Sequence, residues 1–114
     1  MLTKRQQGPG RARRFPIRIP IRFRIPRSTD WFVACTENVS RSGVVFRTER
    51  AFEPATALDM RMELPRTDHN DSVRAEIVCK GEVVRVEQSD PHGVPQTVAV
   101  AIRQYRFAQK RLPN

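Results

Sequence analysis

Apolar and polar residues alternate along most of this chain, and the alternation is clearest between residues 17 and 25. One face of that segment holds Ile17, Ile19, Ile21, Phe23 and Ile25, and the other holds Arg18, Pro20, Arg22 and Arg24. A period of two residues is typical of a half-buried β-strand. Pro20 lacks the N–H group that a central strand needs, so we expect this strand to lie at a sheet edge or to contain a bulge.

The same pattern predicts further strands, separated by short polar segments, over residues 30–40, 42–49, 57–65, 73–88 and 96–105. A tight turn around residues 40–43 should join the first two of these. The strand over 73–88 should bend at Gly81 and exchange faces at Val83 and Val84, because these two valines are adjacent. About six regularly spaced strands favour an all-β fold, a small antiparallel barrel or sandwich. The residues after Tyr105 are expected to form a short C-terminal helix or coil.

A chain of 114 residues is long enough for one domain. Residues 1–12 are polar and contain two glycines and a proline, which predicts a flexible basic N-terminal arm. We expect the β domain over residues 13–107 and a C-terminal tail over 108–114. The sequence contains neither an apolar run long enough to span a membrane nor the apolar region of a signal peptide, so we expect a cytoplasmic protein.

Positive charge is concentrated at the N-terminus of the sequence. Residues 1–28 contain nine of the 21 lysines and arginines and none of the 12 acidic residues. Residues 29–114 therefore have 12 basic and 12 acidic residues, and the net charge of +9 belongs to the N-terminal segment. A basic segment beside a neutral body indicates a partner that carries phosphates or an acidic surface.

The sequence has no pattern typical of an enzyme. His69 and His92 lie in turn-like segments, and neither has a nucleophile or a cluster of metal ligands at a known spacing. Cys35 and Cys79 are far apart in the sequence, and we expect both to be reduced, buried thiols. We therefore expect no catalytic residues, no metal and no cofactor.

Two short motifs have the chemistry to bind a nucleotide. Arg14 and Arg18 are four residues apart, and Pro16 between them stiffens the segment. A guanidinium group can donate two hydrogen bonds to a phosphate or to the O6/N7 edge of guanine. Asn38 and Ser40 can point out from one face of a strand towards a nucleobase. Gly43 follows, and could supply either a positive φ or a close approach of a ligand to the backbone.

The same residues have a simpler interpretation. The two arginines can belong to a solvated basic face, as we expect of Arg22 and Arg24. Asparagine, serine and glycine are also ordinary turn residues, so the segment 38–43 can be no more than a hairpin turn. The combination of both motifs, in this order within an all-β chain, is more specific than either motif alone.

At these residues the sequence resembles a PilZ domain, the bacterial receptor module for cyclic di-GMP, and the resemblance covers roughly residues 13–107. The arginine motif of the family matches Arg14 and Arg18 in "RRFPIR", and its (Asp/Asn)-x-Ser-x-x-Gly motif matches Asn38, Ser40 and Gly43 in "ENVSRSG". The resemblance implies a six-stranded antiparallel β-barrel, often with a C-terminal helix.

The resemblance also implies how the motifs act. The arginine arm would fold over cyclic di-GMP against the barrel, with its arginines on phosphates and guanine edges, and would relay the signal to an unidentified protein partner. The residue before the motif, here Arg13, would add a contact, and in the family it is tied to whether one ligand molecule or an intercalated pair is bound. Arginine at that position favours the pair.

One position departs from the commoner family pattern. Asn38 replaces an aspartate, and an amide has only one acceptor oxygen for the guanine N–H groups. A degenerate PilZ-type adaptor without ligand therefore stays open as an alternative. A second alternative is a basic barrel that binds single-stranded nucleic acid. We consider it less favoured because Phe23, Phe32 and Phe46 lie at core-like positions, which leaves few aromatic side chains for stacking on bases.

Overall fold

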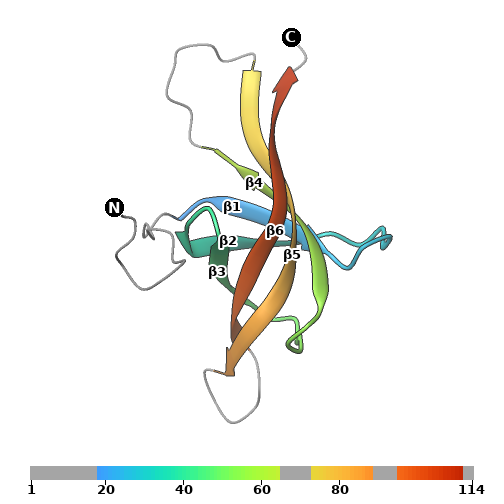
Figure 1. The fold of residues 1–114 in the computed structure, drawn as a ribbon, viewed down its shortest axis with the longest axis vertical. Coiled ribbons are helices and arrows are strands. Elements are labelled where there is room, and N and C mark those ends of the chain that lie inside the picture. The colour runs from blue at the N-terminus through green and yellow to red at the C-terminus, as the bar shows by residue number, and fades with distance from the viewer. Residues whose placement is uncertain (1–17, 65–72, 89–94, 112–114) are drawn as a thin grey trace.

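The computed structural model describes residues 18–64, 73–88 and 95–111, and these residues form six strands and no helix. The strands are β1 (Pro20–Arg24), β2 (Phe32–Val39), β3 (Gly43–Thr48), β4 (Ala57–Glu63), β5 (Val73–Gln88) and β6 (Gln96–Arg111). All pairs are antiparallel, and the order β1-β2-β3-β6-β5-β4 closes into a barrel because β4 also pairs with β1 (Figure 1). The predicted six-stranded antiparallel β-barrel is confirmed.

Strand β1 lies inside the closed sheet, so the prediction of an edge or bulged strand is wrong. Pro20 is opposite Cys35 of β2, but the pairing with β4 begins only at Ile21. The missing N–H group is tolerated because Pro20 is the first residue of the strand. Ile21 and Phe23 are fully buried, as their alternation predicts, whereas Ile25 follows the end of β1 and is 37% exposed.

Large apolar side chains fill the barrel. The ring of Phe23 lies at the centre of an aromatic group, with its centroid 4.7 Å from that of Phe46 and 5.8 Å from that of Phe52. Methionines and aliphatic residues of β3, β4, β5 and β6 complete the buried cluster. Strand β2 contributes less, because its inward residues Phe32 and Ala34 are only partly buried.

The two cysteines have different environments. Both are free thiols, but only Cys79 is buried, whereas Cys35 is exposed on β2. The expectation of two buried thiols is therefore wrong for Cys35. Its neighbours Ala34 and Thr36 point towards the core, so Cys35 lies on the outer face of β2. Burial without a compensating charge raises the pKa of Cys79 to about 12.

Strands β5 and β6 form a long hairpin that contains two irregularities. Opposite Lys80 and Gly81, β6 has one extra residue, Arg103. A Cβ atom on Gly81 would lie 2.6 Å from the carbonyl oxygen of Ala101, so glycine is required where the two backbones approach. Further along β5, Val84 is the extra residue and is 51% exposed, while Val83 is buried. The predicted exchange of faces at these valines is confirmed.

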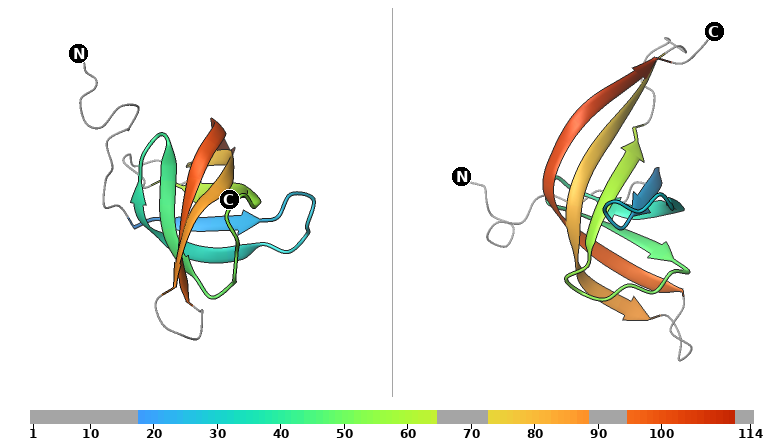
Figure 2. Two further views of the ribbon diagram at one scale, coloured as in Figure 1. Left: turned by 60° about the horizontal axis from the view of Figure 1, so that its bottom comes forward. Right: turned by 90° about the vertical axis from the view of Figure 1, so that its right-hand side faces the viewer.

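Strand β6 extends much further than predicted. Residues 106–111 continue the pairing with β5 as far as Arg111, opposite Val73, so the expected helix or coil is wrong for these residues. Backbone pairing with β5 satisfies the hydrogen-bonding groups on one side of this segment and holds it as a strand. The upper parts of β5 and β6 project beyond the shorter strands (Figures 1 and 2), and β4 pairs with β5 only as far as Glu76. We call residues 73–80 and 103–111 the projecting ribbon.

Candidate functional site

Two hydrogen bonds determine where the chain enters the barrel before β1. The backbone N–H of Ile19 donates to the buried hydroxyl of Thr36 at 2.9 Å, and the N–H of Thr36 donates to the carbonyl oxygen of Ile19 at 2.9 Å. Arg18 immediately precedes this connection and its side chain is exposed. Because β1 and β2 are antiparallel, Arg18 enters beside the end of β2 that leads to Asn38.

A β-bulge directs Asn38 to the outer surface of the barrel. Thr36 is opposite Phe46 and Asn38 is opposite Val45, so Glu37 is the extra residue of β2. Without it, Asn38 would follow Thr36 onto the inner face, two residues further along the strand. The bulge instead turns the next residue, Val39, towards the core, and leaves Asn38 half-buried on the other face.

The turn after β2 is held together by Ser40. Its Oγ accepts hydrogen bonds from the N–H groups of Ser42 and Gly43, both at 3.2 Å. Its own N–H donates to the carbonyl oxygen of Gly43 at 2.8 Å. The hairpin predicted around residues 40–43 is confirmed, and the hydroxyl of Ser40 shapes it.

Gly43 lies at a close approach of two strands, because β3 begins against β6. A Cβ atom at this position would lie 3.0 Å from the carbonyl oxygen of Val100. The φ angle of Gly43 is outside the left-handed region, so of the two uses predicted for this glycine, positive φ is wrong. The close approach involves the backbone of β6. One residue earlier, the carbonyl oxygen of Ser42 accepts a hydrogen bond from the N–H of Ile102 at 2.9 Å.

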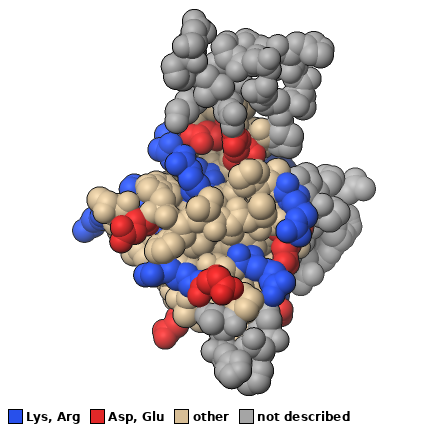
Figure 3. Space-filling model, turned by 180° about the vertical axis from the view of Figure 1, so that it is seen from behind, with Lys and Arg blue, Asp and Glu red and all other residues tan. Residues whose placement is uncertain are grey.

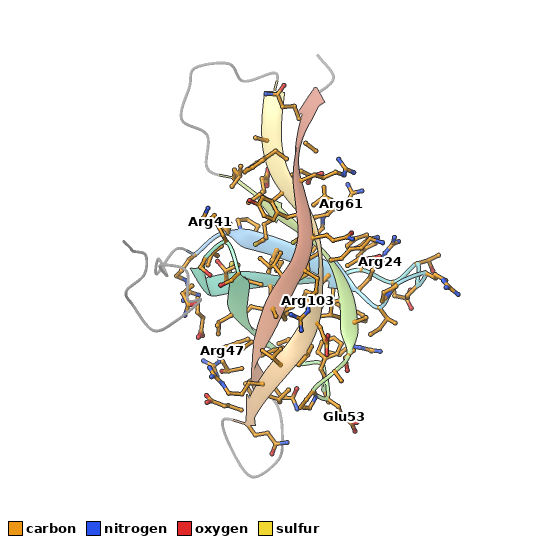
Figure 4. The ribbon with its side chains drawn as sticks, viewed as in Figure 1. Arg24, Arg41, Arg47, Glu53, Arg61 and Arg103 are labelled. Carbon is orange, nitrogen blue, oxygen red and sulfur yellow. The ribbon has the colours of Figure 1, made fainter. Side chains whose placement is uncertain are left out.

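The structure thus places four of the six predicted site residues. Asn38, Ser40 and Gly43 belong to one hairpin, and Arg18 enters the barrel next to it. Arg13 and Arg14 lie outside the described residues, as does the predicted flexible arm over 1–12. The hairpin also carries Arg41, which is exposed at the tip of the turn (Figure 4). The motif did not point to this arginine, because Arg41 stands at a position where (Asp/Asn)-x-Ser-x-x-Gly specifies no residue type.

Comparison with known proteins assigns the fold to a family. The family model for the PilZ domain matches residues 9–112, which is most of the chain. The chain belongs to the PilZ domain family. Members of this family are receptor and adaptor proteins for cyclic di-GMP. No curated protein matches the chain.

A solved structure has a similar fold. The "Structure of Bacillus subtilis Inhibitor of motility (MotI/DgrA)" matches with a TM-score of 0.68 at 15% sequence identity. The match covers 92% of this chain but 45% of the other, so the present chain spans less than half the length of that protein. At this identity the likeness concerns the fold.

The arginines of this PilZ domain differ in how far they are neutralised. Arg22 is exposed, with its guanidinium carbon 5.7 Å from the ring centroid of Trp31, and Arg24 is not simply solvated either. Its Nε lies 3.2 Å from Oδ2 of Asp59, and its guanidinium carbon lies 4.5 Å from the ring centroid of Trp31. Pairing across β1 and β4 brings this acidic residue, distant in sequence, beside the basic strand.

Two aromatic side chains correct the sequence-based view of the surface. On the projecting ribbon, Tyr105 is 47% exposed and Phe107 is 67% exposed, although few aromatic residues were expected at the surface. Among the described residues there is no group of three or more metal-ligating side chains, and no helix long and apolar enough to cross a membrane. His69 and His92 lie outside the described residues. On the face seen in Figure 3, charged side chains surround a central uncharged area.

Proposed function

We propose that this PilZ domain is a receptor for cyclic di-GMP that binds the ligand between its N-terminal arginines and the hairpin of β2 and β3. The observation that supports this most directly is the entry of the chain at Arg18 beside the end of β2 that carries Asn38 and Ser40. Membership of the family supports the ligand class, and the position of Arg18 beside the hairpin supports a shared site for both motifs.

Each residue has a distinct chemical task in this proposal. Arg14 and Arg18 donate to phosphate oxygens and to guanine O6 and N7, and Arg13 adds a further contact. Asn38, turned outwards by the bulge, accepts one N–H of a guanine edge through its single amide oxygen. Ser40 and Gly43 hold the turn in shape beside it.

Ligand binding then becomes a signal through the arm. Like charges in residues 1–18 repel each other, and a ligand with two phosphates removes that repulsion and orders the arm against the barrel. The ordered arm presents a new surface to a protein partner. In this proposal the domain is a cytoplasmic adaptor, not an enzyme, and its free thiols suit that compartment.

Calorimetric titration with cyclic di-GMP tests the proposal. We expect saturable heat with the wild-type protein and a loss of at least about tenfold in affinity for Arg14→Ala, since a charge-assisted bidentate contact contributes about 1.5–3 kcal/mol. Arg22→Ala is the matched control, because it removes an exposed arginine from the same stretch outside the motif. Two ligands per domain would support the role of Arg13.

Two results would contradict the receptor proposal. Absence of heat with wild-type protein up to high micromolar ligand would favour an adaptor without ligand. A gel shift with single-stranded RNA that weakens steeply with salt, in the absence of cyclic di-GMP binding, would favour a nucleic-acid-binding barrel.

A further inference from the structure

Strand β6 loses one of its two neighbours part-way along its length. Its pairing with β3 ends at Ala101, opposite Gly43, and the last backbone bond on that side runs from Ile102 to Ser42. From Arg103 to Arg111, β5 is its only partner within the described ranges. Because antiparallel strands direct alternate backbone groups to each side, the groups of this segment that point away from β5 have no partner strand among the described residues, and this side forms an open edge.

The two faces of the sheet carry different side chains along this edge. Tyr105 and Phe107 are opposite Cys79 and Ile77, so they lie on the core-facing side of the sheet, but beyond the barrel. Arg106 is opposite Val78 on the other face, where it is exposed. An added strand with alternating residues would therefore meet aromatic rings on one side and positive charge on the other.

Charge along the edge selects among possible occupants. Residues 103–111 contain four basic residues, Arg103, Arg106, Lys110 and Arg111, and no acidic one. Arg103 pairs with Glu82 at 3.2 Å, whereas the side chain of Arg106 is exposed. A second copy of the chain would place these charges against each other, which disfavours edge-to-edge dimers. An acidic strand would be attracted.

The aromatic geometry disfavours single-stranded nucleic acid. The rings of Tyr105 and Phe107 are almost perpendicular, at 89°, with their centroids 5.9 Å apart. Successive bases stack nearly parallel to each other, so these two rings cannot both serve as stacking platforms in this arrangement. Valine or isoleucine side chains of an added strand can pack against perpendicular rings without this restriction.

We propose that the open edge of β6, residues 103–111, is the docking site for an extended acidic segment of a partner protein, which adds to the sheet as a further strand. Apolar side chains of that segment pack on Tyr105 and Phe107, and its carboxylates lie beside Arg106. This deepens the relay part of the proposed function. The N–H of Ile102 donates to the carbonyl oxygen of Ser42, in the turn of the proposed ligand motif, and the open edge begins at the next residue. An arm that is ordered by ligand at this turn would therefore lie next to the docked strand.

A designed peptide provides the probe. A fluorescent peptide of alternating glutamate and valine, long enough to span residues 103–111, is titrated into the full chain and followed by anisotropy, with a lysine and valine peptide as the charge control. We expect saturable binding of the acidic peptide only. Hydrogen exchange on the wild-type complex should show new protection of backbone amides within 103–111.

Matched substitutions separate the edge from the rest of the surface. Phe107→Thr and Arg106→Glu should each weaken peptide binding by about tenfold, as expected for a central aromatic contact and a reversed charge. Val84→Thr and Arg85→Glu, on the exposed outer side of β5, should leave it unchanged. All four side chains are exposed, and the exchange measurement on the wild type does not depend on any variant.

Several outcomes would overturn the docking site. These are equal binding of both peptides, protection of amides elsewhere in the chain, dimers in sedimentation that are lost with Phe107→Thr, and tighter binding of single-stranded RNA that is lost with the same variant. Peptide binding together with no heat on addition of cyclic di-GMP would support the docking site and contradict the receptor proposal. Heat on addition of cyclic di-GMP together with no peptide binding would support the receptor proposal and contradict the docking site.

Discussion

The two halves of β6 belong to one continuous strand but have different surroundings. Between Gln96 and Ala101 the strand has β3 on one side and β5 on the other, and Val98, Ala99 and Val100 are buried. Beyond Arg103 it has only β5 among the described strands, and Phe107 is 67% exposed. Burial in this domain therefore depends on having neighbours on both sides of a strand, more than on the hydrophobicity of the strand itself.

The largest test of this comparison uses two phenylalanines. Phe46 is opposite Val98 and fully buried, so Phe46→Ala should lower the free energy of unfolding by about 3–5 kcal/mol through lost burial and a cavity. Phe107→Ala should change it by less than about 1 kcal/mol, because the ring is already mostly in water. Urea unfolding of both variants measures the difference. Equal losses would show that the projecting ribbon is part of the cooperative core.

A smaller effect is expected at the junction of the two halves. Gly81→Ala places a Cβ atom 2.6 Å from the carbonyl oxygen of Ala101, which is backbone and cannot rotate away. We expect a loss of about 1–3 kcal/mol from the forced separation of β5 and β6. Gly43→Ala is the matched control with a milder contact of 3.0 Å, and should cost less. Thermal unfolding measures the loss of stability in each variant. A larger loss for Gly43→Ala than for Gly81→Ala would contradict the tight contact between Gly81 and Ala101.

The smallest effect concerns the pH dependence of a thiol. Cys79 is opposite exposed Tyr105 yet is itself buried, and this burial raises its pKa from the usual 9.0 to about 12. Because the folded state holds the proton more tightly, the contribution of Cys79 to stability is complete below pH 9 and is lost as the pH rises towards 12. Near neutral pH, Cys79→Ala should therefore leave the slope of stability against pH unchanged.

Alkylation tests directly whether Cys79 is inside the barrel core. At pH 8, exposed Cys35 should react readily with iodoacetamide in the folded protein, whereas Cys79 should react only after unfolding. A Cys35→Ser variant isolates the second thiol. Rapid labelling of Cys79 in that variant would place it outside the core and would move the boundary of the barrel back to Gly81.

Much of the fold could be predicted from local pattern. The inward positions Ile21 and Phe23, the hairpin at residues 40–43 and the exchange of faces at Val83 and Val84 each follow from alternation or from turn residues. The status of Arg24 could not be predicted, because its partner Asp59 lies on a strand that becomes adjacent only when the barrel closes. For the same reason Pro20 was expected at an edge that does not exist.

The candidate site shows a similar division. The residue types of the two motifs, Arg14 and Arg18 with Asn38, Ser40 and Gly43, are visible in the sequence and indicate phosphate and guanine chemistry. The outward direction of Asn38 depends on the bulge at Glu37, and a bulge is created by the register between two strands.

Alternation of residues is a local property, and it establishes which side of a strand each residue occupies. Whether that side is covered depends on which strands lie next to it, and this is a property of the closed sheet. The sequence around Tyr105 and Phe107 therefore suits a barrel interior as well as a surface. Only the end of β3 at the motif turn leaves these rings exposed, because no described strand continues beside β6 beyond that point.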